Sequence, residues 1–177
     1  MPAVAREPLA QEIRLTWWRE ALDEIAVGRD VRRHPVAEAL AAAVRRRDLP
    51  AAPLEGMIEA RYEAIDGPPA DEAGRLLRID RTAGAVMRLA AAVLAPGAAA
   101  SPAIAAAARA WALAHAGHTA AARSNLAQAR AAARTLPAAA FPAVAYATLA
   151  RAYRPGRAPS ILEKQFRLLG AVLTGRL

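Results

Sequence analysis

Alanine-rich stretches interrupted by proline and glycine constrain this chain more than any other feature of its sequence. Alanine supplies 52 of the 177 residues, and it has the highest helix propensity while burying little apolar surface. β-branched and aromatic residues are too few and too scattered to predict strands. We therefore expect an all-α helical bundle of closely spaced helices, forming one domain over residues 1–177 with a single core.

Proline and glycine divide the chain into seven predicted helical stretches. The expected ranges are 8–27, 35–47, 53–66, 71–95, 101–135 with a break at Gly117, a stretch between Pro137 and Pro155, and a last helix that opens at Ser160. Ser101 and Ser160 are the expected N-caps of the two helices that begin with serine. Few large side chains are available to hold these helices together. The expected aromatic anchors of the core are Trp17, Trp18, Trp111, Phe141, Tyr146 and Phe166.

Several classes of protein are excluded by what the sequence lacks. It has no cysteine and three histidines, which excludes a disulfide framework and a thiol nucleophile and argues against a histidine-rich metal site. The glycine-rich nucleotide-binding and nucleophile-elbow motifs are also missing. The longest uncharged run, residues 89–108, contains Pro96 and Gly97 and is mostly alanine. We therefore expect a cytoplasmic protein without a membrane span, and peripheral contact with a membrane stays open.

Charge is distributed unevenly along the chain. Residues 1–80 hold 15 acidic residues and 12 arginines, whereas residues 81–177 hold 12 basic residues and one acid, Glu163. The basic half, with a net charge of +11, suits anionic partners, although arginines on solvated helix faces explain it as well. Aromatic residues do not alternate with these arginines as a base-stacking surface requires, so nucleic acid is not an expected partner.

The most informative segment is residues 12–22, which read EIRLTWWREAL. Two adjacent tryptophans on a helix point about 100° apart, so one can enter the core while the other packs against a neighbour. Core anchoring alone explains such a pair. The segment nevertheless closely resembles a signature of the squalene/phytoene synthase family. Three segments that resemble further parts of that family follow in the same order: residues 34–40 (HPVAEAL), 57–61 (MIEAR) and 82–90 (TAGAVMRLA).

The resemblance implies a helical fold of the isoprenoid-synthase type, here shortened. It marks nine family-motif residues as candidates for a site: Glu12, Arg14, Trp17, Trp18, Arg19, His34, Pro35, Glu59 and Arg61. Catalytic members of the family join two prenyl diphosphates head to head. In them, two D-x-x-x-D-type motifs on facing helices hold Mg²⁺ ions, which grip the diphosphate leaving group.

This sequence departs from the catalytic pattern at both acidic motifs. The chain begins after the place expected for the first motif. The second is expected in the region of residues 111–125, and no acid occurs anywhere from Arg81 to Leu162. Glu55, Glu59 and Glu63 share one predicted helix face and are the candidate metal ligands. A solvated acidic stripe accounts for the same three residues.

Three hypotheses about function follow. The first is a family member without the Mg²⁺–diphosphate motifs that serves as a non-catalytic binding or assembly protein, as in the branch that resembles the mitochondrial complex I assembly factor. The second is an active prenyltransferase, which would require Mg²⁺, and the third is an unrelated helical interaction module with a basic surface. The missing motifs favour the first and predict no cofactor, while enzymatic activity stays open. We expect a second copy or a partner protein to cover the Trp17/Trp18 helix, and a prenyl diphosphate or a lipid as ligand.

Overall fold

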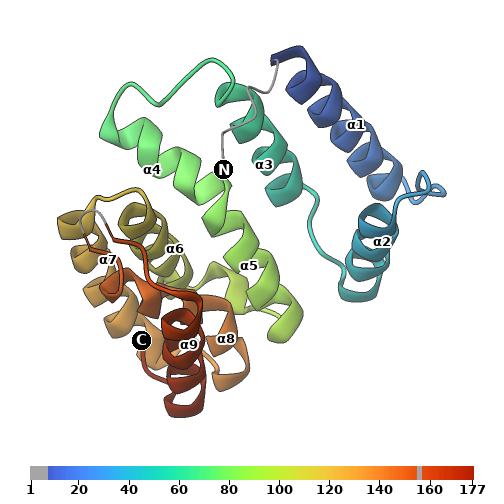
Figure 1. Cartoon of the computed structure of the whole chain (residues 1–177). Coiled ribbons are helices and arrows are strands. Elements are labelled where there is room, and N and C mark those ends of the chain that lie inside the picture. Colours follow the sequence, from blue (N-terminus) through green and yellow to red (C-terminus); the bar gives the residue numbers. More distant parts are fainter. Residues whose placement is uncertain (1–7, 155–156) are drawn as a thin grey trace. The chain divides into compact units, whose positions relative to one another are not determined.

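The computed structural model describes residues 8–154 and 157–177 (Figure 1). Within these ranges the chain forms α-helices and short 3-10 helices, and the one bridge between extended residues joins Arg154 to Arg157. The predicted all-α fold class is therefore confirmed. The chain divides into two compact units, which we call unit 1 (residues 1–75) and unit 2 (residues 76–177).

Unit 1 contains three helices, α1 (Pro8–Ala26), α2 (Pro35–Arg47) and α3 (Ala52–Glu63). Helix α1 packs against both of the others. Among the residues from Pro8 onward, four buried side chains form the centre of their shared core: Leu22, Ile25, Ala41 and Ile58. Asp48 ends α2 in the left-handed conformation, at φ 49°, and its backbone N–H donates to the carbonyl of Val44.

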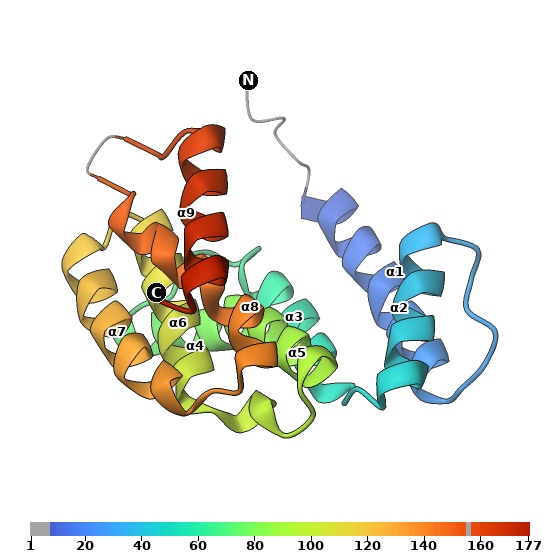
Figure 2. The ribbon, with the colours of Figure 1, turned by 90° about the horizontal axis from the view of Figure 1, so that it is seen from below.

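Unit 2 holds most of the remaining elements, and helix α4 (Glu72–Arg81) crosses the boundary between the units. In chain order the others are α5 (Ala83–Leu94), η1 (Ala98–Ala100), α6 (Pro102–His115), α7 (Thr119–Ala132), η2 (Ala133–Thr135), η3 (Ala138–Ala140), α8 (Phe141–Val144), η4 (Ala145–Arg151) and α9 (Ile161–Thr174). Helix α6 is the central element, since α5, α7, α8 and η4 all pack against it (Figure 2).

Alanine forms most of the core of unit 2. Eight of the fourteen residues of α6 are buried, and six of these are alanine. Small side chains allow neighbouring helix backbones to approach closely, so the core reaches a high packing density with few large groups. The largest fully buried side chains of the described residues are Ile104, Leu113, Val144 and Leu149.

Two of the predicted helices differ from the observed ones. The predicted helix over residues 71–95 is broken at Thr82, whose backbone leaves the helical region at φ −111° and ψ −88°. Its hydroxyl donates to the carbonyl of Arg78 at 2.7 Å, which competes with the regular helix ladder. The stretch after Pro137 is also different, because short 3-10 segments surround the four-residue helix α8.

Other local predictions are confirmed. Gly117 separates α6 from α7 and adopts φ 87°, a conformation that favours glycine. Ser101 caps α6 by accepting a hydrogen bond from the N–H of Ala103, and Ser160 caps α9 by accepting one from the N–H of Glu163. The predicted ranges of α1 and α2 agree with the observed ones to within one residue.

The expected aromatic core is wrong in most of its members. Only Phe141 is buried, the three tryptophans are partly buried, and Tyr146 and Phe166 are exposed at 51% and 73%. The buried residues form two separate clusters, one in each unit, in place of one core. Aliphatic side chains and alanine fill both cluster centres, which leaves aromatic rings at the margins. The assignment of residues 1–177 to one domain stays a prediction.

Candidate functional site

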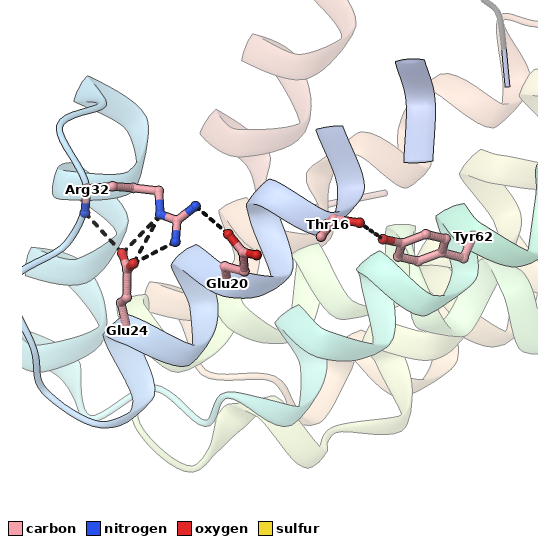
Figure 3. A network of polar contacts seen from close by, with 5 residues as sticks. All are labelled: Thr16, Glu20, Glu24, Arg32 and Tyr62. Carbon is pink, nitrogen blue, oxygen red and sulfur yellow. Dashed lines mark hydrogen bonds and ion pairs between the residues drawn. The ribbon is translucent and has the colours of Figure 1, made fainter. Parts of the chain in front are cut away.

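Two family-motif residues far apart in sequence meet where α1 packs on α3. Nη2 of Arg19 donates to Oε1 of Glu59 at 2.6 Å, and the Arg19 guanidinium lies 4.6 Å from the ring centroid of Tyr62. The hydroxyls of Thr16 and Tyr62 are 2.8 Å apart (Figure 3). The Arg19 and Glu59 side chains are each about half exposed, so this ion pair orients the two helices more than it stabilises them.

The paired tryptophans and His34 form an aromatic cluster. The rings of Trp17 and Trp18 meet edge to face at a centroid distance of 4.9 Å, and the His34 ring lies 5.1 Å from one and 5.5 Å from the other. His34 is also the N-cap residue of α2, followed by Pro35 at the first helical position. The cluster therefore connects α1 to the start of α2.

A polar network on α1 was not predicted from the sequence. The guanidinium of Arg32 donates to Glu24 at 2.6 Å and to Glu20 at 2.8 Å, and the backbone N–H of Arg32 donates to Glu24 at 3.0 Å (Figure 3). These hydrogen bonds from Arg32 lower the pKa of Glu24 to about 2, and the same bonds raise the pKa of Arg32. Arg32 also lies over the ring of Trp17 at 5.3 Å. The i, i+4 spacing of the two glutamates was the only signal in the sequence.

The remaining motif residues take ordinary positions on α1 and α3. The backbone carbonyl of Glu12 accepts a hydrogen bond from the Tyr62 hydroxyl at 3.4 Å. The side chains of Arg14 and Arg61 are exposed. The functional roles of all nine motif residues stay predictions.

The candidate metal ligands on α3 do not form a site that fits Mg²⁺. Glu55, Glu59 and Glu63 are exposed, and Glu59 is bound by Arg19. Magnesium requires several converging oxygen ligands in near-octahedral geometry. Over residues 8–154 and 157–177, no group of three or more histidine, aspartate or glutamate side chains is arranged to hold a metal ion.

Unit 2 contains an apolar pocket of about 390 Å³, a size typical of small-molecule sites. Helix α5 supplies one wall, and α6, α8 and η4 supply the rest. The lining residues are Ala83, Val86, Met87, Ala90, Trp111, Pro142, Ala143 and Tyr146. None of the eight carries a charge, so the pocket suits an apolar ligand.

Ring contacts hold the aromatic wall of this pocket in place. The ring of Trp111 stands nearly perpendicular to that of Tyr146, at an angle of 88°, and stacks on His115 with an angle of 13°. Nδ1 of His115 lies 3.1 Å from the Tyr153 hydroxyl. The region in which the resemblance placed the second acidic motif thus provides an aromatic wall.

The carboxylates of unit 2 are engaged by arginine. Asp80 accepts hydrogen bonds from Nε and Nη2 of Arg109 at 3.0 and 2.5 Å, and these bonds raise the pKa of Arg109. Glu163 accepts from Arg167 at 3.3 Å. These are the two acidic residues of unit 2, and neither lines the pocket.

Comparisons with known proteins identify the family. No curated protein and no solved structure matches the chain. The family model described as squalene/phytoene synthase matches residues 2–117. This range contains the four motif segments and ends just after α6, so α5 and Trp111 lie inside the match while the pocket residues on α8 and η4 lie outside it. The chain therefore belongs to the squalene/phytoene synthase family, whose fold is all-α and of the isoprenoid-synthase type.

Proposed function

We propose that this chain is a non-catalytic member of its family that binds an apolar chain, such as an isoprenoid, in the pocket of unit 2. The observation that carries the proposal is the uncharged lining of that pocket. It includes Trp111, in the segment where catalytic relatives are expected to place carboxylates. An apolar chain in this pocket would gain about 0.8 kcal/mol for each methylene removed from water.

The alternative, an active prenyltransferase, requires carboxylates that converge on Mg²⁺. The acids of unit 2 are bound by Arg109 and Arg167, and on α3 Glu59 is bound by Arg19. These residues do not fit the metal, so they support binding without turnover. A peripheral position at a membrane would bring the pocket close to isoprenoid lipids.

A role in assembly is the second part of this proposal. Helix α1 exposes Leu9 and Ile13 at 64% and 63%, and Trp17, four residues further on, is partly buried. Residues four apart share a helix face, so the three side chains form an apolar stripe. A partner protein or a second copy of the chain would cover this stripe.

Equilibrium binding of geranylgeraniol and geranylgeranyl diphosphate, with and without Mg²⁺, tests the pocket. We expect both ligands to bind with similar affinity, no effect of Mg²⁺, and no condensation product from the diphosphate. Val86→Gln places an amide at the pocket wall and should weaken binding about tenfold, equivalent to about 1.4 kcal/mol. Leu94→Gln is the matched control, because Leu94 is on the same helix, is 43% exposed and lies outside the pocket.

Two results would contradict the proposal. Condensation of the diphosphate by the purified chain would establish an enzyme. Binding that is restricted to the diphosphate and strengthened by Mg²⁺ would place the ligand at a metal-dependent site elsewhere.

A further inference from the structure

Helix α9 presents its apolar face to solvent. Six large apolar side chains on it are between 47% and 75% exposed: Ile161, Leu162, Phe166, Leu169, Val172 and Leu173. Ala171 is its one buried residue, and the charged side chains of Glu163, Lys164 and Arg167 are less exposed than the apolar ones. A surface helix normally shows the reverse arrangement, with its apolar face toward the core. An exposed apolar patch of this extent marks an interaction surface.

A groove of about 410 Å³ runs beside the end of α9, and its lining includes Leu136 and Phe141 from the body of unit 2 and Val172 and Leu173 from α9. Helix α9 packs on η4 (Figure 2). The helix therefore has a fixed place in unit 2 and is not a loose terminal segment.

Basic residues lie on α9 and in the segments on both sides of it. Between residues 151 and 177 the sequence holds six basic residues and one acid, Glu163, which is paired with Arg167. Arg151, Arg154, Arg157 and Arg176 are exposed. An apolar face with a cationic margin is the composition of helices that lie in the surface of an anionic membrane.

The charge distribution also indicates which kind of partner covers the apolar face of α9. Symmetric pairing of two α9 faces would bring two sets of cations together, and the one acid of each set is already engaged, so repulsion opposes it. Nucleic acid would satisfy the cations but leave the six apolar side chains in water. An anionic bilayer satisfies both the charge and the apolar surface.

We propose that α9 docks this protein on anionic lipid bilayers, with Phe166 and Leu169 at the centre of the inserted face. The proposal names the surface for the peripheral membrane contact contained in the proposed function, and it does not require the pocket to be occupied. The lipid chemistry recognised is a negatively charged headgroup surface together with the acyl region beneath it.

Vesicle co-sedimentation of the whole chain tests this docking. We expect binding to vesicles of phosphatidylglycerol and phosphatidylcholine, loss of binding at high salt, and little binding to phosphatidylcholine alone. Phe166→Gln combined with Leu169→Gln should weaken binding at least about tenfold, because the polar amides remove the inserted groups. Leu77→Gln combined with Leu94→Gln is the matched control, since both leucines are exposed residues of unit 2 outside α9, and it should bind as the unmodified chain does. Circular dichroism melts establish that both double variants fold.

Three outcomes would overturn the docking proposal. Equal binding to neutral vesicles would remove the role of charge, and unchanged binding of the α9 double variant would remove the role of the helix. A dimer in sedimentation velocity that the α9 variant dissociates, without any binding to vesicles, would make a second copy the occupant. Val86→Gln separates this proposal from the pocket, because it should bind vesicles normally while its binding of geranylgeraniol is weakened.

Discussion

The two units of this protein are stabilised by different means. The core of unit 1 has four buried residues at its centre, and arginine–glutamate contacts join its segments. The core cluster of unit 2 has 21 buried residues, of which 15 are alanine. Three of the four family-motif segments lie in unit 1, where polar and aromatic contacts join particular residues at particular spacings. In unit 2 the family match ends at residue 117, and the core is packed mainly from small side chains around a few large ones.

Leu113→Ala should have the largest effect on stability and tests the alanine core of unit 2. Leu113 is 1% exposed, and its neighbours on α6 are mostly alanine on closely packed helices, which cannot collapse to fill the cavity. We expect a loss of about 3 kcal/mol in the free energy of unfolding, measured in urea by circular dichroism. Leu94→Ala, at a residue 43% exposed, should cost less than about 1 kcal/mol. A loss of similar size at both positions would show that unit 2 does not depend on its few large residues.

Asp80→Asn should have the next largest effect on the free energy of unfolding. The carboxylate accepts two hydrogen bonds from Arg109, whose side chain is 34% exposed, so partial solvent screening reduces the loss to about 1.5 kcal/mol. The matched control is Glu163→Gln, which weakens an i, i+4 pair at 3.3 Å and should cost at most about 0.5 kcal/mol. Equal costs in urea unfolding would mean that the Asp80–Arg109 pair is an ordinary surface contact.

Gly117→Ala tests the break between α6 and α7. Gly117 adopts φ 87°, which a residue with a Cβ rarely adopts. We therefore expect the alanine variant to lose about 1 kcal/mol in the free energy of unfolding. Gly170→Ala is the opposite control, because Gly170 lies inside α9 with nothing within 4 Å of an added Cβ. It should stabilise the protein by up to about 1 kcal/mol. Thermal unfolding of the two variants should shift in opposite directions, and a shift in the same direction would contradict this reading of the turn.

The elements that local chemistry controls could be predicted from the sequence. Proline at the start of α2, serine caps on α6 and α9, and glycine at the α6–α7 turn each act within a few residues. The break at Thr82 could not be predicted in this way, because the flanking residues favour helix. The chain packs tightly there, and a Cβ on Gly84 would lie 3.2 Å from Arg88 and 3.5 Å from the carbonyl of Ile79.

The site was less accessible to sequence analysis than the fold. The resemblance marked Arg19 and Glu59 separately, but their pairing depends on how α1 packs on α3, forty residues apart in sequence. Periodicity also cannot tell which face of an amphipathic helix is covered, and for this reason Phe166 was expected in the core. The apolar pocket combines α5 with segments around Pro142, and no local pattern connects these segments.

Removing the Glu24–Arg32 pair should have the smallest effect on the free energy of unfolding. The pH dependence of this effect tests the contrast between unit 1, whose segments are joined by polar contacts, and unit 2, whose core is mostly alanine. Hydrogen bonds from Arg32 hold the pKa of Glu24 at about 2, below its ordinary value of 4.5. A carboxylate whose pKa is lower in the folded state than in the unfolded state stabilises the fold at pH values above its unfolded-state pKa. This stabilisation is lost as the pH falls through its folded-state pKa. The stability difference between the unmodified chain and Glu24→Gln should therefore be constant above about pH 4.5 and disappear toward about pH 2.

In an Arg32→Gln background the same Glu24→Gln substitution should show no such pH dependence. A difference that persists undiminished at about pH 2 would mean that Glu24 contributes through packing and not through its charge.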